Sequence, residues 1–209
     1  MKFIIRLFSA LILTFSYIEL AYSKTTKIII FGDSLIAGYG LVVEDNFVNQ
    51  LKLKTIENKI NDVTLFNSGV SGETSTGLLN RYKWVLEDNY DGVIILIGAN
   101  DALRGIDPSL TSQNIEKILS YLKEKQIPTM LIGMKAPNNL GEIYVNEFNA
   151  IYPKLSKKYD TAYYPFFLKD VALKPSLNQR DMIHPNKKGV KIIVNNFFPY
   201  FLNFYESLK

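Results

Sequence analysis

The clearest indication of the fold class is the stretch Lys27-Ile28-Ile29-Ile30-Phe31 (KIIIF), which is followed directly by Gly32-Asp33-Ser34. It is a continuous apolar run rather than an alternating one. Such runs are typical of strands in a parallel sheet that is covered on both faces. A second run of this kind, Val93–Ile97 (VIILI), ends in Gly98-Ala99-Asn100-Asp101. Together the two runs predict a parallel α/β architecture.

The remaining elements alternate between short apolar runs and longer amphipathic stretches. Further strands are predicted over Val63–Phe66, Thr129–Met134 and Thr161–Tyr164. Helices are predicted over Asn46–Lys54, Thr74–Leu86, Leu110–Lys125, Val145–Lys158 and Lys187–Ser207, with the last one interrupted near Pro199. Alternation of this kind gives βαβ units with right-handed crossovers. We therefore expect an α/β fold with a doubly wound, flavodoxin-like open parallel sheet of about five strands flanked by helices.

The composition limits the class of protein. The 209 residues suit one domain with a full-sized core, and 47% apolar with 21% charged residues is an ordinary globular balance. The formal net charge of +4 comes without a Lys/Arg cluster, so no nucleic-acid partner is expected. The chain has no cysteine and one histidine, which excludes disulfides, thiolate zinc sites and multi-histidine metal centres. No cofactor is expected.

The first residues read as a targeting segment. Lys2 and Arg6 precede an apolar stretch, Leu7–Ile18, that is short for a bilayer span, and Ala21-Tyr22-Ser23 is a small-x-small ending. We expect residues 1–23 to be a signal peptide and residues 24–209 to be the folded domain, exported to the periplasm or secreted. An uncleaved anchor helix is the alternative.

Three predicted strands end in polar or glycine-rich loops. Gly32-Asp33-Ser34 follows the first, Gly69-Val70-Ser71-Gly72 the second and Gly98-Ala99-Asn100-Asp101 the third. Because the carboxyl ends of parallel strands meet at one edge of a sheet, these loops should lie together. That edge would hold a hydroxyl, a turn with open backbone N–H groups and an amide side chain. Acyl transfer needs these parts, as nucleophile and oxyanion donors.

The single histidine, His184, lies in Asp181-Met182-Ile183-His184-Pro185. A serine hydrolase needs a base that takes the serine proton, and histidine is the usual one near neutral pH. If the chain is such an enzyme, His184 must be that base, and Asp181 could hold its imidazole in one tautomer. No other side chain is expected to titrate in the same range, so an acid limb in the pH–rate profile would belong to His184.

Each part also has a purely structural explanation. Gly-Asp-Ser is a common turn and helix cap, glycines permit positive φ, and lone histidines are more often structural than catalytic. The joint pattern is more specific, because every piece falls at its predicted strand end. Competing patterns are missing: the sequence has no Gly-x-Ser-x-Gly elbow, no Walker loop and no Gly-x-Gly-x-x-Gly after the first strand.

The chain resembles the SGNH (GDSL) hydrolases, and in particular their bacterial periplasmic thioesterase/lysophospholipase/arylesterase branch. The matching stretches are FGDSLIAGYG (Phe31–Gly40), NSGVSGETS (Asn67–Ser75), GANDALRG (Gly98–Gly105), NEFNAIYPKL (Asn146–Leu155) and DMIHPN (Asp181–Asn186). The resemblance implies Ser34 as nucleophile, His184 as base and Asp181 as its orienting partner. It also implies an oxyanion hole made by the backbone N–H groups of Ser34 and Gly72 and the side-chain amide of Asn100.

We therefore expect an exported serine esterase that hydrolyses carboxylic esters and thioesters, lysophospholipids included, as a monomer. The alternatives are a carbohydrate O-acetylesterase and a non-catalytic ligand-binding domain of the same fold. The loop 134–141 resembles a mobile substrate-side loop but could be an ordinary connection. The aromatic cluster over 197–205 could make transient contact with a membrane surface, although packing of the last helix onto the sheet is the more ordinary explanation.

Overall fold

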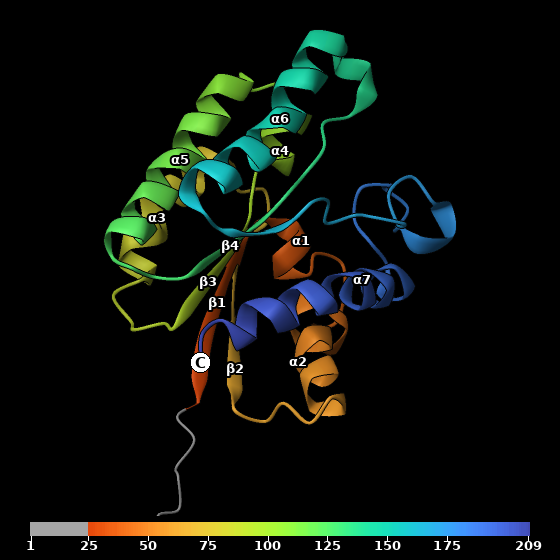
Figure 1. Ribbon diagram of the computed structural model, residues 1–209. Coiled ribbons are helices and arrows are strands. Elements are labelled where there is room, and N and C mark those ends of the chain that lie inside the picture. The colour runs from red at the N-terminus through yellow and green to blue at the C-terminus, as the bar shows by residue number, and fades with distance from the viewer. Residues whose placement is uncertain (1–24) are drawn as a thin grey trace, which may run out of the picture.

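The computed structural model describes residues 25–209 and shows one parallel sheet with helices on both faces (Figure 1). Its five strands are β1 (Thr26–Gly32), β2 (Val63–Gly69), β3 (Gly92–Leu96), β4 (Thr129–Ile132) and β5 (Ala162–Tyr164), in the order β2-β1-β3-β4-β5. All pairings are parallel. The predicted doubly wound, flavodoxin-like fold is confirmed. The predicted signal peptide, residues 1–23, lies outside the described residues.

The two decisive runs form the centre of this sheet. Strand β1 pairs with β3 in a register that places Phe31 opposite Ile95. Ile28, Ile30 and Ile94 are each fully buried. Continuous burial along both strands explains why their sequences do not alternate, because each face of the sheet is covered by helices.

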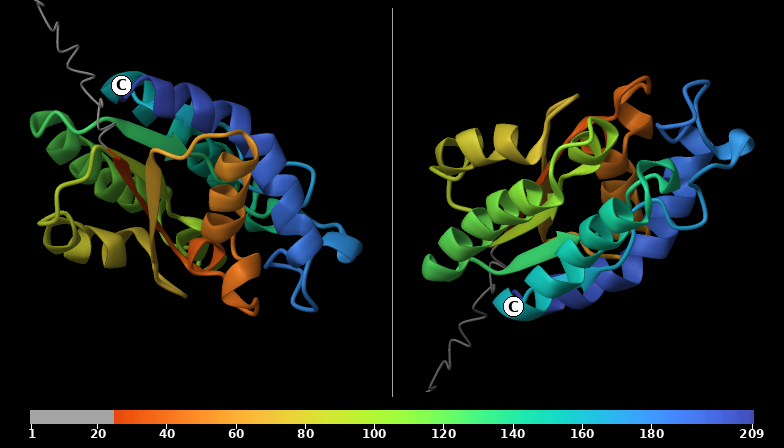
Figure 2. Two further views of the ribbon diagram at one scale, coloured as in Figure 1. Left: turned by 90° about the horizontal axis from the view of Figure 1, so that it is seen from below. Right: turned by 90° about the horizontal axis from the view of Figure 1, so that it is seen from above.

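The helices form two layers, which are seen from opposite sides in Figure 2. One layer contains α2 (Phe47–Glu57) and α7 (Lys187–Glu206), and the other contains α3 (Ser75–Val85), α5 (Pro108–Glu124) and α6 (Glu142–Tyr159). Two short helices, α1 (Ser34–Ala37) and α4 (Ala99–Leu103), begin where β1 and β3 end. The order of strands reverses between β1 and β3, and this switch point is where open α/β sheets bind ligands.

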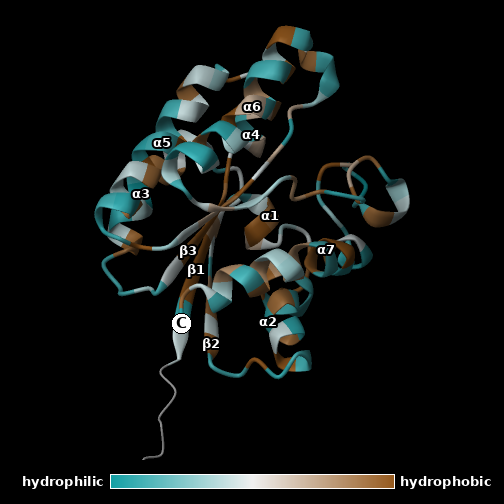
Figure 3. Cartoon of the chain, in the orientation of Figure 1, coloured by the Kyte–Doolittle hydropathy of each residue, from teal (hydrophilic) through white to brown (hydrophobic). Residues whose placement is uncertain are grey.

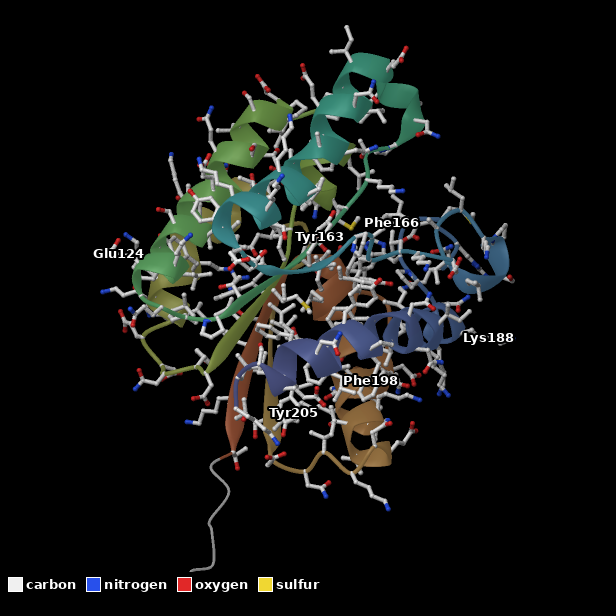
Figure 4. The ribbon with its side chains drawn as sticks, viewed as in Figure 1. Glu124, Tyr163, Phe166, Lys188, Phe198 and Tyr205 are labelled. Carbon is white, nitrogen blue, oxygen red and sulfur yellow. The ribbon has the colours of Figure 1, made fainter. Side chains whose placement is uncertain are left out.

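The predicted interruption of the last helix near Pro199 is wrong, because α7 continues through this residue. A proline inside a helix costs about 3 kcal/mol through the lost hydrogen bond and the ring clash. The apolar face on both sides of it offsets this cost: Phe197 and Phe201 are fully buried and Phe198 is nearly so. The aromatic cluster thus packs onto the sheet, with only Tyr200 of this cluster markedly exposed. Figure 4 labels Phe198 and Tyr205 along the helix.

Within residues 25–209, no helix combines the length and the apolar character that crossing a membrane requires.

Candidate active site

Ser34 stands at the switch point, as the first residue of α1. The turn that carries it is tight, because a Cβ on Gly32 would lie 2.3 Å from the side chain of Ile36 and 2.9 Å from the carbonyl oxygen of Leu96. Asp33 caps α1 by accepting the backbone N–H of Leu35 at 2.9 Å. Gly32 and the Asp33 cap therefore determine the position of the Ser34 hydroxyl at the end of β1.

The structure brings the predicted residues Ser34, His184 and Asp181 into one hydrogen-bonded chain. His184 Nε2 lies 2.8 Å from Ser34 Oγ, and His184 Nδ1 lies 2.6 Å from Asp181 Oδ2. Asp181 Oδ1 also accepts the backbone N–H groups of Ile183 and His184, at 2.9 and 3.0 Å. Burial opposes ionisation of Asp181, but these N–H groups and the imidazole hold its pKa down to about 2. The carboxylate is therefore charged at any pH near neutrality.

Two residues that the sequence analysis missed hold His184 in place. The backbone N–H of Gln179 donates to the His184 carbonyl at 2.8 Å, and the Gln179 side chain donates to the Tyr39 carbonyl, also at 2.8 Å. The Tyr39 ring lies 4.6 Å from the imidazole, between centroids. The cavity next to Ser34 and His184 has a volume of about 10 Å³, which is room for about one water. Close packing around the imidazole limits its movement.

Gly72 and Asn100 also lie at this edge of the sheet. Gly72 has φ +79, a left-handed conformation that glycine adopts without the usual penalty. Asn100 lies in the first turn of α4, and its Nδ2 donates to the Glu73 carbonyl at 3.0 Å. A carboxamide has two N–H groups, so the second one is not used by this bond. Arg104 connects α4 to the same turn by donating to the Gly72 carbonyl at 2.7 Å.

An ion pair closes the loop that carries Gly72. Arg81, on α3, contacts both carboxylate oxygens of Glu73, at 2.5 and 2.7 Å. The same guanidinium donates to the side chain and the carbonyl of Ser68, at 2.8 and 2.7 Å. Arg81 thereby joins the end of β2 to the residue whose carbonyl holds Asn100. Glu73 and Arg81 are eight residues apart, and no helical spacing rule pairs them, so this contact could not be predicted from the sequence.

The pKa of Asp33 is raised into the neutral range, although the sequence analysis expected no carboxyl group there. Its side chain is fully buried, and its Oδ2 has no hydrogen-bond partner among the described residues. Burial is the main cause that raises the pKa of Asp33 to about 7, with Asp101 and Glu73 adding to it. Asp101 is equally buried but accepts three hydrogen bonds, from Ser75 N, Ser75 Oγ and Thr111 Oγ1. Within the described residues, the Asp33 carboxyl, by contrast, accepts one hydrogen bond, from the backbone N–H of Leu35, so fewer donors stabilise its charged form.

This burial predicts a pH-dependent stability. The unfolded chain loses the Asp33 proton near pH 3.8 and the folded chain near pH 7, so the stability of the native state falls between these values. Each unit of difference costs about 1.4 kcal/mol. Asp33→Asn keeps an oxygen for the cap and cannot ionise. The urea midpoint of the variant should therefore rise relative to wild type between pH 4 and pH 7. A difference that stays constant with pH would show that Asp33 is charged in the folded protein.

The loop 134–141 forms part of the wall of an open groove. The groove has a volume of about 560 Å³ and lies between Leu140–Ile143 on one side and Gly105–Pro108 on the other. Because Gly105 directly follows Arg104, this groove begins one helical turn beyond Asn100. The loop is therefore placed beside the site, on the side of α4.

The fold is shared with known proteins. The psychrotrophic esterase EstA from Pseudoalteromonas sp., in a structure inhibited by monoethylphosphonate, superposes with a TM-score of 0.81 at 32% identity, covering 87% of this chain and 99% of that one. An arylesterase from Vibrio mimicus is 34% identical over 186 residues, 88% of this chain and 92% of the relative. Thioesterase 1/protease 1/lysophospholipase L1 from Escherichia coli K12 is 36% identical over 169 residues, 80% of this chain and 79% of the relative.

With this fold and these relatives, the chain is a serine hydrolase that acts on ester bonds. Residues 30–192 match the model of the GDSL-like Lipase/Acylhydrolase family, and the chain belongs to that family. The resemblance found in the sequence is thus confirmed.

Proposed function

We propose that the chain is an exported hydrolase for carboxylic esters and thioesters, of the arylesterase, thioesterase and lysophospholipase type, and that Ser34, His184 and Asp181 carry the reaction. The observation that supports the assignment most is the hydrogen-bonded chain from Ser34 Oγ to Nε2 at 2.8 Å and from Nδ1 to Asp181 Oδ2 at 2.6 Å. A non-catalytic binding domain would have no need of this series of hydrogen bonds between Ser34, His184 and Asp181.

In the proposed reaction, His184 Nε2 takes the proton of Ser34 as Oγ attacks the carbonyl carbon. Asp181 stabilises the imidazolium that forms. The imidazolium then gives the proton to the leaving alkoxide or thiolate, and an acyl-serine remains. Water then attacks the acyl carbon while the same imidazole takes its proton, and the imidazolium returns this proton to Ser34 Oγ as the bond to the acyl group breaks and the acid is released. The open groove beside α4 is the place that we propose for the part of the substrate away from the carbonyl.

We propose that the backbone N–H groups of Ser34 and Gly72 and the amide of Asn100 stabilise the oxyanion. Asn100 is oriented by its bond to the Glu73 carbonyl, which leaves one N–H for the substrate. Donors that are held in place before the reaction cost no reorganisation when the charge develops. The contacts of Arg81 and Arg104 with the Gly72 loop would help to hold these donors in place.

A fluorophosphonate probe tests the assignment of the nucleophile. The probe should label wild type at Ser34, identified by peptide mass spectrometry, and labelling should be absent in a protein first denatured. A chain that binds esters without cleaving them would not be labelled. A panel of p-nitrophenyl esters of graded chain length, thioesters and acetylated sugars would then define the substrate class, since an O-acetylesterase would prefer the sugars.

Asn100→Ala tests the oxyanion role. If the amide acts only when charge develops on the carbonyl oxygen, kcat should fall by roughly 10²–10³ while KM changes little. Asn58→Ala, which removes an exposed amide at the end of α2, is the control and should leave both constants unchanged. A large rise in KM with kcat preserved would instead make Asn100 a residue that binds the ground state.

A further inference from the structure

The segment between β5 and α7 projects from the molecule beside the site, and all views agree on this (Figures 1 and 2). Its parts are tied together around Asn178, whose side chain donates to the carbonyls of Val171 and Lys174, both at 2.8 Å. Asn178 also forms a β-bridge with Pro185, the residue after His184. The projecting segment and the imidazole are therefore parts of one local unit.

This segment exposes apolar side chains. Leu173 is 80% exposed, and Met182 and Ile183 are 37% and 42% exposed. Figure 3 shows hydrophobic stretches on this projecting loop. Leu173 and Met182 also have positive φ values, +61 and +60, which cost about 1 kcal/mol or more for residues with a Cβ. The backbone is therefore strained at two of the positions that expose apolar side chains to solvent beside the catalytic histidine.

The same segment concentrates the positive charge of the chain. Residues 169–191 contain six Lys and Arg and two Asp, a net charge of +4, whereas the rest of residues 25–209 contains fifteen Lys and Arg and seventeen Asp and Glu, a net charge of −2. Lys174, Arg180 and Lys188 are exposed and form no ion pair within the described part of the chain. Figure 4 labels Lys188 at the outer end of α7. In the sequence, the six cationic residues lie before, between and after the exposed apolar ones.

We infer that residues 171–188 form a docking face for an anionic phospholipid surface. One short segment that carries both exposed aliphatic side chains and exposed, unpaired lysines and arginine matches such a surface, because the apolar groups enter the interface while the cations remain at the headgroups. Charge complementarity distinguishes this occupant from a free acyl chain, which would need the apolar groups but not the cations. The face adjoins His184, so docking would bring the active site close to esters held in the bilayer. This last consequence rests on the proposed function, but the docking itself does not.

Vesicle sedimentation tests the docking, using residues 25–209 so that the apolar leader contributes no binding. The protein should bind vesicles of equal parts phosphatidylglycerol and phosphatidylcholine, bind pure phosphatidylcholine far more weakly, and be released by salt. Lys174→Gln/Lys188→Gln should weaken binding roughly 25-fold, at about fivefold for each lysine. The matched control, Lys123→Gln/Lys125→Gln, removes two exposed lysines from the other end of the sheet and should bind as wild type.

Leu173→Gly tests whether the exposed leucine serves docking or structure. Glycine relieves the positive φ, so the urea midpoint should rise, while vesicle binding should weaken by about tenfold because the apolar contact is lost. Ile56→Ser, at an exposed apolar position on α2, should bind as wild type. A Leu173 that only stabilised the fold would give a lower midpoint and unchanged binding.

Two results would overturn the docking face. One is equal binding to charged and neutral vesicles, and the other is equal weakening by the two double lysine variants, which would mean that net charge alone acts. In an activity arm, Lys174→Gln/Lys188→Gln should keep the wild-type rate on a soluble p-nitrophenyl ester and lose rate on lysophospholipid held in charged vesicles. If no ester is hydrolysed by any form, the proposed function fails while the binding arm still decides the docking.

Discussion

Ser34→Ala is expected to lower kcat for ester substrates by about 10⁶, the cost of removing the nucleophile from a serine hydrolase. Alanine lacks the oxygen that attacks the carbonyl and that lies 2.8 Å from His184 Nε2. The fold should survive, because within residues 25–209 the hydroxyl is hydrogen-bonded to the imidazole and the side chain is not part of the buried core. Steady-state assays, with thermal unfolding measured alongside, check both expectations.

The matched control is Ser176→Ala, which removes an exposed hydroxyl from the three-ten turn Pro175–Leu177. This variant should keep the wild-type rate and its labelling by the phosphonate probe. If Ser34→Ala retained even a tenth of the wild-type rate with a correctly folded protein, Ser34 would not be the nucleophile.

Asp181→Asn is expected to lower kcat by about 10⁴, as for triads in which the carboxylate becomes an amide. The amide would present an N–H where the imidazole now has a carboxylate at 2.6 Å, and this favours the wrong tautomer of His184. A second effect concerns pH. Because the pKa of Asp181 is about 2, its negative charge is present throughout the working range and favours the imidazolium. Without this charge the imidazole loses its proton more readily, so the acid limb of kcat/KM should move to lower pH.

The pH–rate experiment needs two comparisons. Asp170→Asn removes a carboxylate from the same segment without contacting the imidazole, and its limb should coincide with that of wild type. Asp33, whose pKa is raised to about 7 by burial, titrates in the same range, so the profiles are also measured in an Asp33→Asn background. An acid limb that does not move in Asp181→Asn, in either background, would mean that Asp181 does not act on the base.

The types and order of the residues were enough to predict the sheet and the places of Ser34, Asn100 and His184 in the candidate site. Continuous apolar runs such as KIIIF and VIILI are typical of a covered parallel sheet, and such a sheet brings the carboxyl ends of its strands to one edge. Ser34 and Asn100 each follow one of these runs, so their proximity is a consequence of local sequence. The candidate base could be assigned to His184 at once, since the chain has one histidine. These features depend on residue type and order, which a sequence contains.

The contacts that support the site and the raised pKa of Asp33 depend on how the chain packs in three dimensions. The contacts of Arg81 with Glu73 and of Arg104 with Gly72 join segments that no spacing rule relates, because the geometry of the loops determines them. The burial of Asp33, and hence its raised pKa, depends on which elements cover it and not on its own type. Pro199 stays inside α7 for the same reason: burial of the aromatic residues on both sides outweighs a local preference. Burial and long-range contact are properties of the packed chain, and they set the energies that local sequence leaves open.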